Sequence, residues 1–306
     1  MQALFNLLIF PGFGFLLVCG WLFEWLDRRI LARTQGRVGP PWYQPVADFI
    51  KLLAKEDLLP TGANATAVTI LPLVSLAAVL TAGLYIPIAG HSVAKFDGDF
   101  IVILFLLSLP ALAYFLAGWA SVGVYSILGG NRSLLQFFSY EVPFLMALSG
   151  PAILAGSWQL SDIAANQAIT GWGLFAQPLG FLLALVGLIG KLKRDPLDIP
   201  KAKSEMVAGA LTEFSGRKLA LWHLTMDMQT AVGIFLLVNT FMGGSLAWGP
   251  LPAGLLFALK SLAILVALSF ISALYARLRI DQLASLGWRV LAPLALAQLV
   301  FTVWMG

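Results

Sequence analysis

Cysteine and histidine are nearly absent from this chain of 306 residues, which contains one cysteine, Cys19, and two histidines, His91 and His223. A single cysteine excludes a disulfide within the chain and an iron–sulfur cluster ligated by its own cysteines. Two histidines are too few to ligate two haems inside a helical bundle. We therefore expect the chain to bind no cofactor or metal ion, so that any redox centre belongs to a partner.

Charged residues are also scarce, forming 11% of the sequence against 59% hydrophobic residues. A soluble domain has roughly 25% charged residues. The mean hydropathy is +0.88, and apolar runs long enough to cross a ~30 Å hydrocarbon core recur along the whole chain. The sequence therefore predicts an all-α polytopic membrane protein, with a single integral membrane domain over 1–306. We expect about eight transmembrane helices, at approximately 3–26, 66–88, 100–126, 137–157, 172–190, 219–241, 252–275 and 287–305.

Lysine and arginine are distributed unequally between the two sides of this predicted topology. Seventeen of the 19 lie in loops on one side, Lys95 alone lies on the other, and Lys260 lies within a predicted helix. Cytoplasmic loops carry an excess of these residues, so we expect both termini to face outward. The cytoplasmic loops are then approximately 27–65, 127–136, 191–218 and 276–286. The net charge of +4 reflects these loops, and we expect no nucleic-acid partner.

The first cytoplasmic loop contains a segment with helical periodicity, QPVADFIKLLAKEDLL. Its apolar residues recur at roughly helical spacing, with Lys51, Lys55 and Glu56 between them. This pattern predicts an amphipathic helix lying at the membrane interface in contact with lipid. A plain interfacial anchor remains an equal alternative to a functional role.

A few ionisable residues fall within or near the predicted helices: Glu141, His223, Asp227 and Lys260. Charge within a membrane is costly, so each is a candidate functional residue. His223 and Asp227 are spaced i and i+4, and so share a helix face and could hydrogen-bond. We favour a proton path over the alternative of structural ion pairs, such as Lys260 with Asp227. These residues alone fit a transporter, a channel or a subunit of an ion-pumping complex.

Several separated motifs carry a specific resemblance. The segment RDPLDIPKAKSEMVAGALTEFSG, residues 194–216, resembles the signature loop of the membrane subunit that joins the peripheral and membrane arms of respiratory complex I. RVGP at 37–40, IKLLAKEDLLP at 50–60, SYEVP at 139–143 and RLRIDQLASLGWRVLAPL at 277–294 are similar to other motifs of that family, in the same order. The resemblance extends over the whole chain and implies eight helices.

The chain departs from the quinone-reducing members of this family at several acidic positions. Lys191, Lys201 and Lys203 stand where those members usually have glutamates, and Met226 stands where they have a sixth-helix glutamate, although Asp227 is adjacent. The first loop is also shorter. These departures make the chain more similar to the related subunit of membrane-bound energy-converting nickel–iron hydrogenases, and of formate-hydrogenlyase or sulfur-reducing complexes.

The resemblance implies a connector subunit in the plasma membrane of a bacterium or archaeon. Its cytoplasmic partners would be hydrogenase-like large and small subunits and an iron–sulfur subunit, which would hold the nickel–iron centre and the iron–sulfur clusters. Antiporter-like membrane subunits would neighbour it and move protons or sodium ions. The first alternative is the corresponding connector of a quinone oxidoreductase that accepts electrons from NADH or ferredoxin, whose loops would wall a quinone chamber. The second is a stand-alone cation transporter.

We assign provisional roles to the polar residues on this basis. The candidates for an ion relay are Glu141, Glu205, Glu213 and Asp227, with His223 and Lys260 stabilising or passing charge. The candidates for the docking surface and its loops are Arg37, Asp48, Lys51, Glu56, Arg194, Asp198, Lys201, Lys203, Arg277, Arg279 and Asp281. Fixing the loops at the membrane surface is an equal alternative for each docking residue.

Overall fold

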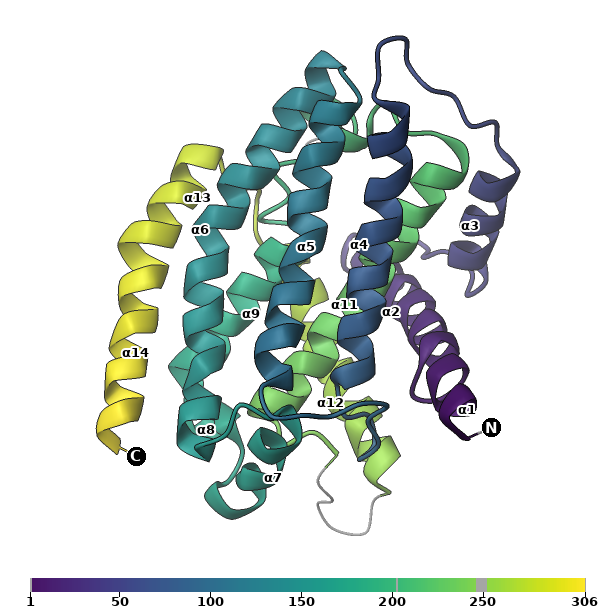
Figure 1. Ribbon diagram of the computed structural model, residues 1–306. Coiled ribbons are helices and arrows are strands. Elements are labelled where there is room, and N and C mark those ends of the chain that lie inside the picture. The colour runs from purple at the N-terminus through teal and green to yellow at the C-terminus, as the bar shows by residue number, and fades with distance from the viewer. Residues whose placement is uncertain (1, 202, 246–251, 306) are drawn as a thin grey trace.

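The computed structural model describes residues 2–201, 203–245 and 252–305, and the described parts form a bundle of helices (Figure 1). Within these parts, Ile88 and His91 form an isolated antiparallel β-bridge. The elements are α1 (Gln2–Leu8), α2 (Phe13–Thr34), α3 (Gln44–Ala54), α4 (Ala65–Tyr85), α5 (Asp99–Ala120), α6 (Val124–Ala155), α7 (Leu160–Thr170), α8 (Gly173–Ala176), α9 (Pro178–Leu192), α10 (Lys203–Met206), η1 (Gly209–Leu211), α11 (Gly216–Phe241), α12 (Ala253–Leu274), α13 (Ile280–Leu286), the π-helical segment η2 (Gly287–Leu291) and α14 (Ala292–Met305).

The all-α polytopic fold is confirmed. Seven segments of the described chain are long and apolar enough to cross a membrane. The fifth expected span is shorter than predicted, because Gln177 interrupts it after α8 and the 15-residue α9 begins anew at Pro178. At about 1.5 Å per residue, α9 spans only about 23 Å. Both ends of the described chain lie toward the lower end of the bundle in Figure 1, an arrangement that fits seven long spans together with the shorter α9.

One predicted loop is wrong. Residues 127–136, expected to be a cytoplasmic loop, lie within the 32-residue helix α6, and the connection from α5 is the short turn Ser121–Gly123. This segment contains Gly129 and Gly130, and glycine commonly marks the end of a helix. The two glycines instead let other backbone approach closely, since a Cβ on Gly129 would lie 2.5 Å from the Ala210 nitrogen. Helix boundaries elsewhere also shift, because residues 27–34 and 280–286 are helical.

Helix α11 is the centre of the bundle. Twenty of its 26 residues are buried, and it packs against α2, α4, α7, α9 and α12. Figure 1 shows it behind α4 and α5, crossing the middle of the molecule. A helix that is buried nearly all round can carry polar groups only where a neighbour supplies partners or a cavity. Its polar residues therefore point to the functional part of the molecule.

The expected amphipathic helix in the first loop is present as α3. It stands beside α2 and α11 at the edge of the bundle (Figure 1). Phe49 faces inward, with its ring centroid 5.8 Å from that of Trp21, whereas Ile50 and Leu53 are exposed. An apolar outer face next to lysines suits the boundary between lipid and water.

Candidate functional site

A close approach between α2 and α11 positions the main polar site. Gly20 of α2 lies against the backbone of Asp227, since a Cβ there would come within 3.1 Å of the Asp227 carbonyl carbon. Glu24, Asp27 and Arg28 follow Gly20 by one to two turns, at i+4, i+7 and i+8, and so face the same side of α2. The approach therefore brings three charged side chains toward Asp227.

These residues line a cavity of about 570 Å³ between α2, α11 and the loop that follows α9. Ten of its lining residues are ionisable: Glu24, Asp27, Arg28, Lys193, Arg194, Asp195, Asp198, Lys201, His223 and Asp227. We call this space the charged cavity. So many charges in one cavity require water or paired partners, because an isolated buried charge is costly.

Ion pairs fix part of the charged cavity. Arg28 contacts Glu24 at 2.6 Å and Asp48 of α3 at 3.0 Å. Arg194 contacts Asp27 at 2.8 Å, and the Ser269 hydroxyl of α12 donates to the same carboxylate. These contacts tie α2 to α3, to the loop after α9 and to α12. Two residues from the docking set, Asp48 and Arg194, therefore join helices within this chain.

A smaller cavity of about 300 Å³ lies under α3 and shares Arg28, His223 and Asp227 with the charged cavity. His223 and Asp227 share a helix face as predicted, but the structure gives no hydrogen bond between their side chains. Both instead face the two cavities. Of the six relay candidates, these two are the ones that line the charged cavity.

Glu141 lies away from the cavity, in a buried ion pair. Its Oε1 is 2.8 Å from Lys191 Nζ, and the two side chains are 7% and 1% exposed. The lysine also donates to the Leu107 carbonyl at 3.3 Å and lies 5.2 Å from the ring centroid of Phe144. Lys191, which stands where quinone-reducing members usually have a glutamate, thus pairs with Glu141, the glutamate of the SYEVP motif. The pair holds a fixed charge arrangement inside the bundle.

Two other lysines face the charged cavity from the loop after α9. Burial lowers the pKa of Lys193 to about 7, with repulsion from Lys201 and Lys191 adding to the effect. Burial also lowers the pKa of Lys201 from its ordinary value, against the attraction of Asp198. Lys201 Nζ contacts Met226 Sδ at 2.9 Å. Lys201 and Met226 both stand where quinone-reducing members of the family usually have glutamates. In this chain the two side chains are in contact with each other.

Lys260 lies elsewhere, at the far end of α11. Its Nζ donates to the carbonyls of Met242 and Gly244, at 2.6 and 2.9 Å, and lies 4.9 Å from the ring centroid of Trp172. The suggested ion pair of Lys260 with Asp227 is therefore wrong. A lysine here satisfies carbonyls that the end of a helix leaves without partners.

Glu205 and the last loop form a separate groove of about 490 Å³, lined by charged residues that include Arg132, Arg277, Arg279 and Asp281. Glu205 pairs with Arg132 and lies 3.9 Å from Arg277. Glu213 is placed apart from it, against Gly123. The structure therefore distributes the relay candidates over several places, while Arg277, Arg279 and Asp281 lie together.

The remaining docking candidates lie at loops. Arg37 and Lys51 are exposed, and the Glu56 carbonyl accepts a hydrogen bond from Ser215. The side chain of Lys203 lies outside the described residues. The described residues contain no cluster of three or more His, Cys, Asp or Glu side chains placed to hold a metal ion.

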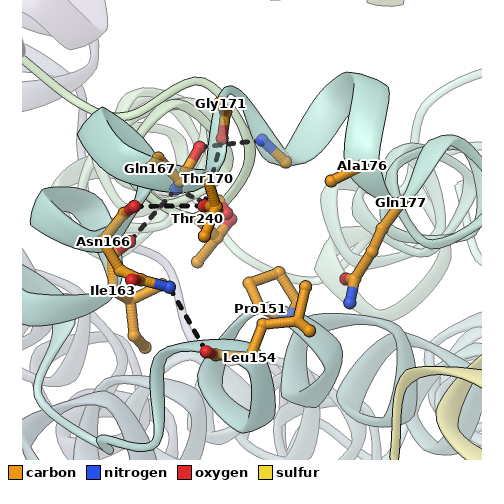
Figure 2. Close-up of a pocket in the computed structure, with 11 residues that line it drawn as sticks. Pro151, Leu154, Ile163, Asn166, Gln167, Thr170, Gly171, Ala176, Gln177 and Thr240 are labelled. Carbon is orange, nitrogen blue, oxygen red and sulfur yellow. Dashed lines mark hydrogen bonds between the residues drawn. The ribbon is translucent and has the colours of Figure 1, made fainter. Parts of the chain in front are cut away.

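Figure 2 shows a pocket lined by residues of α6, α7 and the end of α11. Helix α7 lies at the lower end of the bundle in Figure 1. Its volume is about 20 Å³, enough for about one water molecule. Gln167 donates there to the carbonyls of Asn239 and Thr240, both at 3.0 Å. These hydrogen bonds anchor the end of α11. None of the residues that line the pocket is ionisable.

Sequence reasoning missed Lys193 and the contact between Lys191 and Glu141. It noted Lys191 as a departure from the family but gave it no partner. Glu24 and Asp27, which lie near the end of the first predicted helix, were also given no role. Their i, i+3 spacing after a glycine was the available signal, since it predicts one polar face next to a close helix contact.

The groove offers a prediction of small effect. Arg132→Ala is expected to lower the stability of the protein by less than about 1 kcal/mol, because its pair with Glu205 is largely exposed. Arg132 lowers the pKa of Glu205 below its ordinary 4.5, so the contribution is present above that pH and lost as the pH falls. Thermal denaturation of the purified protein measures it, and a loss of several kcal/mol would contradict the assignment.

Comparison with known proteins gives consistent matches over the whole chain. A family model described as NADH dehydrogenase matches residues 6–303. The chain is 37% identical to the NADH-quinone oxidoreductase H subunit of Dehalococcoides mccartyi, over 95% of this chain and 83% of the relative. It is 39% identical to an NADH-quinone oxidoreductase H subunit of Geobacter sulfurreducens, over 91% and 89%.

A solved structure is also similar. A chain of the membrane-bound sulfane sulfur reductase, an archaeal respiratory membrane complex, matches with a TM-score of 0.89 and 25% sequence identity. The match covers 99% of this chain and 100% of that one.

Proposed function

Because this chain belongs to the NADH dehydrogenase family, whose curated members include the H subunits of bacterial NADH-quinone oxidoreductases, we propose that it is the membrane connector subunit of a complex I-like respiratory assembly. In this role it binds a peripheral iron–sulfur arm on the cytoplasmic side. It takes part in redox-coupled proton or sodium translocation with neighbouring antiporter-like subunits. The chain itself holds no redox centre, and the iron–sulfur clusters and nickel–iron centre belong to its partners.

Within this family we assign the chain to the branch that includes energy-converting nickel–iron hydrogenases, formate-hydrogenlyase complexes and sulfur-reducing complexes. The observation that carries this assignment is the presence of lysines in place of family glutamates. Lys201 faces the charged cavity, and Lys191 pairs with Glu141. A relay built from carboxylates at those two positions cannot operate in this chain. The similarity to an archaeal sulfane sulfur reductase supports the same branch.

The second candidate function is that of a quinone-reducing connector, with the charged cavity as part of a quinone chamber. Identities of 34–39% to proteins named as H subunits of NADH-quinone oxidoreductase favour it. The lining of the cavity favours the first candidate, because ten of the lining residues are ionisable. A quinone ring and its isoprenoid tail need a largely apolar pocket with only a few polar groups.

Purification of the native complex tests the proposal. A tag on this chain should bring down hydrogenase-like large and small subunits and an iron–sulfur subunit. Recovery of this chain alone would instead indicate a stand-alone cation transporter. Membranes should then transfer electrons from reduced ferredoxin or formate to protons or sulfane sulfur, and quinone should be neither required nor reduced. Quinone reduction by the intact complex, abolished by quinone-site inhibitors, would contradict the hydrogenase-type assignment and favour the second candidate.

A further inference from the structure

Lys193 occupies a backbone conformation that lysine seldom adopts. It caps the C-terminus of α9 with φ 51° and ψ 48°, in the left-handed region that favours glycine or asparagine at this position. A non-glycine residue persists there only when its surroundings hold it, and such residues cluster at functional sites. We therefore look to the side chain of Lys193 to explain why a lysine stands at this position.

The side chain of Lys193 extends into the charged cavity. The residue lines the cavity and is 8% exposed. Its Nζ lies 4.5 Å from the ring centroid of Tyr114, so its close partner is an aromatic face. Among the described residues, no carboxylate lies within the 4.0 Å ion-pair distance of this ammonium group. Lys193 is thus a buried cation without an ion pair, next to space for water.

The charges around Lys193 come from each element that packs near it. Lys191 at the end of α9 and Lys201 in the following loop repel it, whereas Asp198 in that loop and Glu141 of α6 attract it. Tyr114 of α5 covers one side. Across the cavity, α2 and α11 contribute Glu24, Asp27, Arg28, His223 and Asp227, and the loop adds Arg194 and Asp195.

This arrangement allows the charge of Lys193 to change near neutral pH. Burial and the neighbouring lysines lower its pKa from 10.5 to about 7. A group titrating near the working pH exchanges protons most efficiently. The neighbouring Lys191 does not face the cavity, because its side chain is hydrogen-bonded to Glu141 and to the Leu107 carbonyl.

We propose that Lys193 is a proton-exchanging residue of the charged cavity, and that the ion passing this point is a proton and not sodium. The inference rests on the proposed function in so far as the proton belongs to a translocation path. In the step itself, an N–H bond of the ammonium group breaks, the proton passes to cavity water, and the electron pair stays on Nζ. A second water molecule then donates a proton to the electron pair on Nζ, which restores the positive charge of Lys193.

Ion translocation by the whole complex tests the proposal. The complex carrying wild-type chain, Lys193→Met or Lys193→Arg is placed in vesicles, and proton movement per electron transferred is followed with a pH-sensitive dye. Both variants should lose coupled proton movement at pH 7 by about tenfold or more, because neither can exchange a proton near that pH. Lys95→Met, which removes an exposed lysine that lines neither cavity, is the matched control and should behave as wild type.

Three outcomes would overturn the proposal. Retained coupling in Lys193→Arg would show that only a fixed positive charge is needed. Retained coupling in Lys193→Met would show that the residue has no part in the path. Translocation of sodium without any movement of protons would show that the translocated ion is sodium and not a proton.

A direct titration separates this inference from the function on which it rests. Acetylation of Lys193 in the intact complex, followed by mass spectrometry across pH, reports its protonation without any transport. Half-maximal reactivity near pH 7 supports proton exchange at Lys193 even if the wild-type complex moves no ions, in which case the proposed function alone fails. Half-maximal reactivity near the ordinary value of 10.5 overturns the inference.

Discussion

Replacing Lys191 with methionine is expected to destabilise the protein by about 3–5 kcal/mol, because it leaves the Glu141 carboxylate buried without its cation. Lys191 is the partner that the structure gives to this carboxylate: it binds Oε1, while Oε2 is buried without a hydrogen bond. The measurement is the thermal denaturation of the detergent-solubilised protein, together with the yield of assembled complex.

The double variant Lys191→Met/Glu141→Gln is the control for this prediction. Removing both charges leaves no uncompensated ion, so most of the lost stability should return. Lys95→Met is a matched control for the loss of a lysine, since Lys95 is exposed and should cost little. A double variant as unstable as Lys191→Met would contradict an ion-pair origin of the effect and indicate a packing defect.

Substitution of Gly209 by alanine is expected to cost about 2–5 kcal/mol, from a strained backbone and a steric clash. Gly209 has φ +60°, and an added Cβ would overlap the Pro200 carbonyl oxygen. Because Gly209 also lies against Gly129 of α6, the loop has little room to move away. The expected result is a lower thermal stability and a lower yield of assembled complex.

Gly62→Ala is the matched control for this substitution. Gly62 has φ +90°, but an added Cβ would meet nothing within 4 Å. It therefore carries the backbone strain without the clash, and should cost roughly 1 kcal/mol. Equal losses in the two variants would show that the contact with Pro200 contributes nothing.

The membrane fold could be predicted because hydrophobic length determines it almost alone. Apolar runs locate the spans, and the distribution of lysine and arginine orders them. The loop at 127–136 could not be predicted, because glycines that usually end a helix here serve a contact with Gly209, which is about 80 residues distant in sequence. The short α9 was equally hidden, since apolar residues continue through α8 while Pro178 begins a new helix.

The candidate site could be predicted as a set of residue types but not as an arrangement. Asp227 and His223 were found because a charged or polar group in a spanning helix is rare. The partner of Glu141 could not be found, because Lys191 is 50 residues away along the chain. Lys193 was missed because nothing in its residue type signals a left-handed backbone or a cavity. Both facts depend on how helices pack.

Helix α11 also has a mechanical consequence. It spans about 39 Å at 1.5 Å per residue, with His223 and Asp227 in its first half and the carbonyls held by Gln167 and Lys260 at its C-terminal end. Since it is buried along most of its length, the close packing around it leaves it little room to bend locally. A tilt that widens the charged cavity must therefore displace the far end as well. Helix α11 thus connects the charged cavity to the opposite end of the bundle, and a displacement of one end of the helix is transmitted to the other.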